Sequence, residues 1–177
     1  MKKIIYFLSF LLVFVFTTSS FAQTKNPVQY ADIVKGIQLP YPGLLPDNPF
    51  YFLKMARDRI VGIFISSPLK KIDFDVLQAD KRLNAGVFLI ARGDKKYQLA
   101  LTTISKGENY FPDALRNINS AKQQGMVVEG ERQKVKESLM NHEQILKEVE
   151  NILPGSFKKT VVEEEKKIQG YENSVEK

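Results

Sequence analysis

The stretch Ser67–Asp94 reads SPLKKIDFDVLQADKRLNAGVFLIARGD, and its pattern decides the fold class. Apolar residues return every three or four positions over about six turns, which predicts one face of a long α-helix and does not fit strand alternation. Ser67 and Pro68 are typical of a helix start, and Gly93 is typical of a helix end. The face consists of Leu69, Ile72, Val76, Ala79, Leu83, Val87 and Ile90.

A second amphipathic segment follows almost immediately. Asp94 can cap a new helix directly after Gly93, so the connection is very short and the two helices must be antiparallel neighbours. Pro112 lies inside this segment, and we expect a kink or a short break there because proline disrupts the preceding turn. The apolar face of the segment consists of Tyr97, Leu101, Ile104, Phe111, Leu115 and Ile118.

Further helices are predicted on both sides of this pair. Asn48 and Pro49 resemble an N-cap and a first helical position, and they predict a helix near 49–64 with Leu53, Ala56, Ile60 and Ile63 at helical spacing. Residues 123–130 form a predicted turn before a helix near 130–152. Pro154 and Gly155 end that helix, and a last helical face consists of Phe157, Val161, Ile168, Tyr171 and Val175.

The first 22 residues contain the three parts of a secretory signal peptide in the correct order. A basic start precedes the apolar run Ile4–Phe16, and small residues follow, including Ser20 and Ala22. We expect cleavage between Ala22 and Gln23, which places the mature chain outside the cytoplasm, in the periplasm or the medium. The alternative is an uncleaved N-terminal helix that tethers the protein to a membrane, although a spanning helix needs about 20 apolar residues.

The sequence therefore predicts an all-α protein, an antiparallel bundle of four to five helices preceded by a signal peptide and a proline-rich loop. Four of the eight prolines precede the first predicted helix, where they prevent a continuous helix. We expect Tyr41, Leu44 and Leu45 in this loop to pack against the bundle. The predicted parts are a signal peptide (1–22), a proline-rich linker and loop (23–48), the helical bundle core (49–153) and a C-terminal helix or tail (154–177).

The composition excludes several classes of site. The chain has no Cys, which removes disulfides, thiolate metal sites and thiol nucleophiles. The single histidine, His142, falls between Leu139 and Leu146 on a helix seam, and we interpret it as a packed or half-exposed structural residue. We therefore expect no catalytic residues, no metal site, no cofactor and no enzymatic activity. Without Lys2 and Lys3 the formal charge falls from +6 to +4, which is too modest to indicate nucleic-acid binding.

Two acidic groups have simple structural interpretations. Asp73, Asp75 and Asp80 lie in the long helix without the glycine and alternating ligands of a calcium loop. We interpret them as ion-pair partners of Lys70, Lys71, Lys81 and Arg82. The run Glu163–Lys167 is interpreted as a solvated helix face.

An aromatic cluster precedes and opens the first predicted helix. It consists of Tyr41, Phe50, Tyr51 and Phe52. One interpretation is a patch that contacts a partner or an apolar ligand, and the other is a cap on the end of the bundle.

From the first interpretation we expect a non-enzymatic helical interaction module of the cell envelope or secreted space. Its partner would be an unknown envelope protein or an acidic surface approached through lysines. Membrane contact is expected only through an uncleaved signal segment. The alternative function is a carrier of a small apolar ligand within the bundle.

The stretch Tyr41–Lys54, YPGLLPDNPFYFLK, resembles the opening motif of a bacterial family of exported or membrane-tethered helical proteins, catalogued as a domain of unknown function. The motif of that family is Pro-Asp-Ser/Asn-Pro-x-Tyr-x-Leu-Lys, and two long helices follow it. The resemblance extends over roughly residues 40–122 and includes Ser67–Lys71, Ala79–Leu83 and Gly93–Ala100. It implies a helical fold and supplies no catalytic residues.

Overall fold

The computed structural model describes residues 28–175, so the predicted signal peptide, its cleavage position at Ala22 and Gln23, and the start of the linker lie outside the described residues. The all-α prediction is confirmed, because these residues form helices and no strand. The helices are α2 (Tyr30–Val34), α3 (Tyr51–Phe64), α4 (Pro68–Ala91), α5 (Tyr97–Glu108), α6 (Tyr110–Gln123), α7 (Glu129–Ile152) and α8 (Gly155–Val175), with a 3-10 turn, η1 (Asp94–Lys96).

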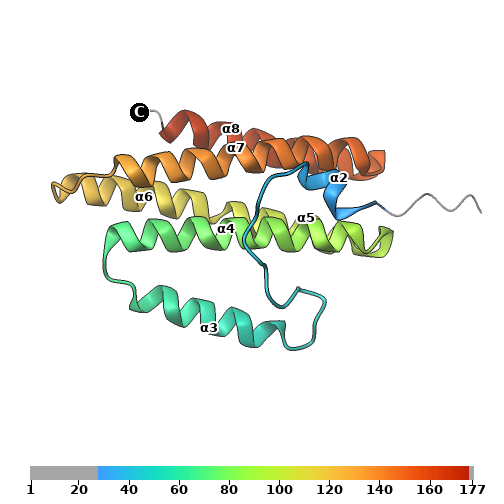
Figure 1. Ribbon diagram of the computed structural model, residues 1–177, viewed down its shortest axis with the longest axis horizontal. Helices are drawn as coiled ribbons and strands as arrows, with labels where there is room; N and C mark the ends of the chain where they lie inside the picture. The colour runs from blue at the N-terminus through green and yellow to red at the C-terminus, as the bar shows by residue number, and fades with distance from the viewer. Residues whose placement is uncertain (1–27, 176–177) are drawn as a thin grey trace, which may run out of the picture.

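Helix α4 is the central element of the bundle. It packs against α2, α5, α6 and α7, and α8 packs mainly against α7. Figure 1 shows α3 at one edge of the molecule, with α7 and α8 on the opposite side of α4. Helix α3 therefore contacts the rest of the fold from one side only.

The predicted boundaries of α4 agree with the structure. Ser67 is the N-cap and Pro68 is the first helical residue. Gly93, just beyond the end of α4, has a φ of +100°, which a side chain would strain. The chain then turns through η1 directly into α5, and the two helices run antiparallel as expected.

The predicted third helix is two helices, α5 and α6, joined at Asn109. Pro112 is in the first turn of α6 and has no N–H to bond to the carbonyl of Glu108, so the chain bends at the expected place. Because of this break, the described chain has six helices of 12 residues or more, where the sequence indicated four or five.

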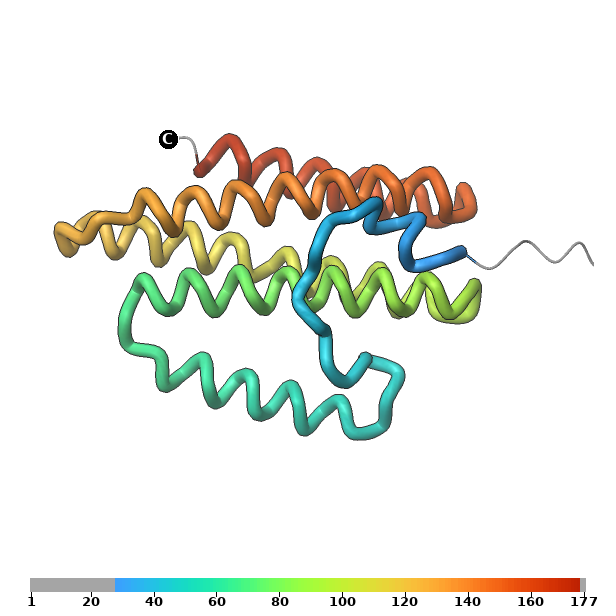
Figure 2. Tube along the Cα trace, in the orientation of Figure 1, coloured from blue at the N-terminus to red at the C-terminus, as the bar shows by residue number. Residues whose placement is uncertain are grey.

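The described part of the predicted linker, from residue 28 to 48, contributes to the folded body. Ile33 and Val34 of α2 are buried where α2 meets α4 and α7. The Tyr30 hydroxyl donates to Asn84 Oδ1 at 2.8 Å, and Asn84 Nδ2 donates to the Pro40 carbonyl at 2.9 Å. The chain then crosses α4 on its way to α3 (Figure 2).

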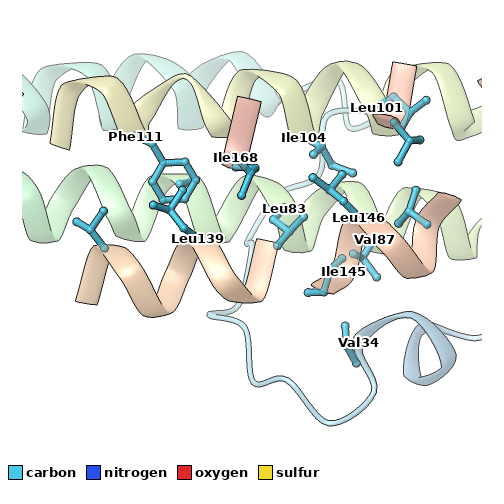
Figure 3. Close-up of a cluster of buried hydrophobic side chains, with 14 of the residues drawn as sticks. Val34, Leu83, Val87, Leu101, Ile104, Phe111, Leu139, Ile145, Leu146 and Ile168 are labelled. Carbon is cyan, nitrogen blue, oxygen red and sulfur yellow. The ribbon is translucent and has the colours of Figure 1, made fainter. Parts of the chain in front are cut away.

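The hydrophobic core joins side chains from every helix except α3 (Figure 3). Tight backbone contacts between α4 and α5 add to it. A Cβ on Gly86 would lie 2.4 Å from Ile104 Cγ1, and a Cβ on Gly107 would lie 2.8 Å from Arg82 Cβ. These glycines allow the two helices to approach closely. Fully buried core residues include Leu83, Val87, Ile104, Phe111, Leu139, Ile145, Leu146 and Ile168.

Candidate functional site

Helix α3 is packed with Lys54 and Asp58 inward and its apolar residues outward. Lys54 and Asp58 are only 9% and 8% exposed, whereas Ile63 and Phe64 are 72% and 80% exposed. An amphipathic helix on a soluble protein ordinarily has the reverse arrangement. We call the exposed apolar side of this helix the outer face of α3; it consists of Phe52, Leu53, Ala56, Ile60, Ile63 and Phe64.

Polar contacts hold the opposite side of α3 to the bundle. Lys71 Nζ donates to the Gly62 carbonyl at 2.9 Å, where a Cβ on Gly62 would meet the Phe74 ring at 3.1 Å. Further along, Arg82 Nη2 lies 3.2 Å from Met55 Sδ. Because the joint is polar, α3 keeps its position without burying its apolar side chains.

A cleft with a volume of about 610 Å³ runs between α3 and helices α4 and α6. Its walls include the charged residues Asp58, Lys71 and Asp75. Burial raises the pKa of Asp75 to about 6, even though Lys71 is near and Asn117 Nδ2 donates to its carboxylate at 3.1 Å. The cleft is therefore of mixed character, because the apolar side chains of Met55, Ile63 and Phe74 line it beside these charged groups.

The structure exposes three of the four residues in the predicted aromatic patch. Tyr41, Phe50 and Phe52 are 79%, 61% and 63% exposed. Tyr51 is half-buried on the inner side, with Lys54 Nζ 5.3 Å from its ring centroid. The patch therefore divides, and three of its aromatic rings face solvent near the first turn of α3.

The loop before α3 differs in part from expectation. Leu45 is buried as predicted, but the packing expected for Tyr41 and Leu44 is wrong. Pro42 and Leu45 take the buried positions, and Tyr41 and Leu44 turn outward to line a hollow with Leu53 and Lys54. The apolar surface of α3 thus continues onto the loop.

Asp47 fixes this loop to the end of α4. Its Oδ2 lies 2.6 Å from Arg92 Nη1 and 3.1 Å from Lys96 Nζ. Partial burial alone would raise the pKa of Asp47, but these two cations hold it below its usual value. Asn48 does not cap α3 directly; its Oδ1 accepts from the Phe50 N–H at 2.9 Å, and the helix begins at Tyr51.

Asp73 and Asp80 of α4 pair with another helix, so the predicted pairing within α4 is wrong for these two, whereas Asp75 does interact with Lys71. Asp73 pairs with Lys134 of α7 at 2.6 Å, and Asp80 accepts a hydrogen bond from Ser138. Positions 73 and 80 are seven residues apart and share one helix face, which α7 covers. The packing of α7 against α4 therefore brings polar partners to these aspartates from a distant part of the sequence.

His142 is fully buried, which is the first of the two placements that the sequence left open. Its ring packs edge-on against Phe111 with centroids 4.9 Å apart, and Nε2 lies 3.3 Å from Asp80 Oδ1. Ser138 and His142 both lie close to the same aspartate, but no hydrogen bond within the described chain joins Ser138 to His142. This geometry is not that of a nucleophile paired with a general base.

A buried pair of carboxyl groups, which the sequence patterns did not predict, lies between α5 and α8. Glu108 is 0% exposed and Glu164 is 5% exposed, so the prediction of a solvated face fails at Glu164. Burial and the neighbouring Glu164 raise the pKa of Glu108 to about 10. Burial alone would raise the pKa of Glu164 as well, but Glu108, Lys167 and Ser105 keep it below its usual value.

Residues 28–175 lack two further features, a metal-binding cluster and a membrane-spanning helix. No three His, Cys, Asp or Glu side chains are grouped in a way that could hold a metal ion. None of the helices in this part of the chain combines the length and the apolar character that crossing a bilayer requires. The outer face of α3 is the surface feature that most needs an explanation.

The model of a family described as a domain of unknown function, DUF5667, matches residues 43–156. The chain belongs to this family. The match extends beyond the region of sequence resemblance and runs from the loop before α3 to the start of α8, so DUF5667 includes α3 and its joint with α4. No curated protein and no solved structure matches the chain.

Proposed function

We propose that this DUF5667 protein is an exported, non-enzymatic binding module of the cell envelope, and that it docks through the outer face of α3. The inverted burial of α3 carries the proposal. Fully burying one large apolar side chain is worth roughly 1.5–3 kcal/mol, so exposing Ile60, Ile63 and Phe64 together forfeits a large gain in stability. A contiguous exposed apolar face is characteristic of an interaction site.

The location outside the cytoplasm rests on the sequence. Lys2, Lys3 and the run Ile4–Phe16, followed by Ser20 and Ala22, support export and cleavage. The mature chain then reaches the envelope or the medium, where its docking surface meets a partner. The geometry at Ser138, Asp80 and His142 supports a role without catalysis, because it lacks a nucleophile bonded to a base.

Sedimentation with cell-envelope fragments from the source cells tests the proposal. We expect the wild-type protein to sediment with the fragments, and a variant with Ile60→Ser and Ile63→Ser to stay in the supernatant. Met140→Ser is the matched control, since Met140 is an exposed apolar residue on α7. Equal sedimentation of the α3 variant and the wild type would contradict the proposal, and so would no sedimentation of any form.

The alternative function, a carrier of a small apolar ligand inside the bundle, has less support. The interior between the helices is occupied by side chains such as Leu83, Ile104 and Leu146 (Figure 3). A bound apolar molecule on the purified protein in native mass spectrometry would favour the carrier over the docking module.

A further inference from the structure

We propose that the outer face of α3 docks onto the surface of an anionic lipid bilayer, with the helix lying in the plane of the membrane. This inference rests on the proposed function and names the partner of the same surface. An interfacial helix buries its apolar side at the boundary between headgroups and acyl chains, and its basic side chains contact the lipid phosphates. The sequence led us to expect membrane contact only through an uncleaved signal segment, and the outer face of α3 would be a second membrane contact.

Two arginines border the outer face of α3. At about 100° of rotation per residue, Arg57 falls at one edge of the apolar face and Arg59 at the opposite edge. Both are exposed, whereas the only acid of α3, Asp58, is buried on the inner side. The exposed charges of the helix are therefore all positive, which complements a layer of lipid phosphates.

The two arginines differ in their present partners. Arg57 pairs with Asp58 at 2.6 Å, with 66% of its side chain exposed. Arg59 has no ion pair within the described part of the chain. Arg59 can therefore bind a phosphate without breaking an ion pair, although it also lines the cleft between α3 and the bundle.

Aromatic side chains extend the docking surface at both ends of α3. Phe64 is 80% exposed at its C-terminal end. At its N-terminal end, Tyr41 is 79% exposed in the adjoining loop, and tyrosine rings are enriched where headgroups meet acyl chains. Figure 1 shows α3 at the edge of the molecule with α7 and α8 on the far side of α4, so a flat surface can reach α3 unobstructed.

A second copy of the chain is a poorer occupant of this face. If the outer faces of two α3 helices packed symmetrically, the arginines of one copy would meet those of the other. The exposed part of α3 offers no acid to compensate, and like charges across an interface oppose association. The apolar segment Ile4–Phe16 also lacks any acidic residue that would complement the arginines.

The chain has no Trp, so a single introduced tryptophan reports on its own position. Phe64→Trp places the reporter on the outer face of α3, and Met140→Trp places a matched control on α7. The exported protein is titrated with vesicles of phosphatidylcholine alone, or of phosphatidylcholine and phosphatidylglycerol in equal parts. We expect a blue shift, and quenching by brominated acyl chains, only for Phe64→Trp and chiefly with phosphatidylglycerol.

Substitutions then separate the apolar and the charged contributions. Ile60→Ser with Ile63→Ser should weaken binding to the mixed vesicles at least about tenfold, because apolar burial is lost. Arg59→Gln should weaken it by about fivefold and leave any binding to pure phosphatidylcholine unchanged. Met140→Ser and Lys158→Gln, both exposed and away from α3, should bind as the wild type does.

Several results would overturn the inference. One is the absence of any blue shift, and another is equal binding to neutral and anionic vesicles. A third is that the protein forms a dimer, that Ile60→Ser with Ile63→Ser abolishes this dimer, and that the wild type does not bind vesicles. If envelope fragments capture the protein through α3 but pure lipid vesicles do not, the partner is a protein. In that case the lipid inference fails and the proposed function stands; if neither binds, both fail.

Discussion

At the residue scale, the buried carboxyl pair is the most unusual chemistry in the fold. Within the described chain no donor reaches either oxygen of Glu108, so a protonated Glu108 that donates to Glu164 is the arrangement that satisfies both groups. Glu164 also binds Lys167 Nζ at 2.9 and 2.8 Å. Burial raises the pKa of Tyr171 in α8, and the charges of Glu108, Glu164 and Lys167 also act on this residue. Glu108 and Glu164 therefore have to share one proton for both carboxyl groups to remain buried.

We predict that Glu108→Gln increases the free energy of unfolding above pH 5, and increasingly so toward pH 9. The pKa of Glu108 rises from 4.5 to about 10 on folding, so the wild type loses stability as the pH rises between these values, and the amide does not. The gain should grow by no more than about 1.4 kcal/mol per pH unit. Urea unfolding of both proteins at several pH values measures it, and parallel stability curves would disprove the assignment.

At the element scale, the close approach of α4 and α5 depends on glycine. We predict that Gly107→Ala destabilises the fold by about 1–3 kcal/mol, because its Cβ would lie 2.8 Å from Arg82 Cβ and 3.1 Å from the Ala79 carbonyl. Gly170→Ala on α8 is the control. Nothing lies within 4 Å of its Cβ position, so it should stabilise α8 by roughly 0.5–1 kcal/mol. Thermal unfolding compares the two, and equal effects would contradict the packing described for α5.

Helix α3 should respond to mutation unlike the other long helices. We predict that Ile63→Ala changes the free energy of unfolding by less than about 0.5 kcal/mol, because the side chain is exposed. Ile104→Ala in α5, which removes a fully buried side chain, should cost about 2–5 kcal/mol. Denaturant titration measures both values. A comparable loss from Ile63→Ala would mean that α3 buries its apolar face.

The sequence predicts the helices better than it predicts their orientation. Ser67, Pro68 and Gly93 mark the limits of α4 because capping and chain reversal are local. The spacing of Ile60 and Ile63 reveals a stripe on α3 but cannot show that the stripe faces outward, since orientation depends on polar contacts made by Lys71 and Arg82 of α4. Contacts between distant segments are not encoded by local spacing.

The buried carboxyl groups did leave a signal in the sequence. Glu108 occupies the position between Ile104 and Phe111 where the apolar face of its segment requires a buried residue. Glu164 occupies the equivalent position between Val161 and Ile168. A carboxylate at an apolar-face position of an amphipathic helix indicates a buried acid. At Glu164 this signal is hard to recognise, because the neighbouring charges Glu163 and Glu165 make the whole run resemble an exposed face.

At the scale of the whole molecule, export determines which surface the protein can meet. We predict that the protein isolated from its source cells has the mass of residues 23–177, because Ala22 and Gln23 flank the expected cleavage site. Intact mass spectrometry of the extracytoplasmic fraction measures this. The mass of the full 177-residue chain would show that the N-terminal segment is retained.

Helix α3 turns Lys54 and Asp58 to the bundle and its apolar side to the surroundings. Because the chain contains no Cys, single-cysteine variants along α3 can be labelled with a maleimide without background. We predict rapid labelling for Ala56→Cys, Ile60→Cys and Ile63→Cys, and labelling slower by at least about tenfold for Lys54→Cys and Asp58→Cys. The opposite pattern, with fast labelling at 54 and 58 and protection at 56, 60 and 63, would show that α3 buries its apolar side and exposes Lys54 and Asp58.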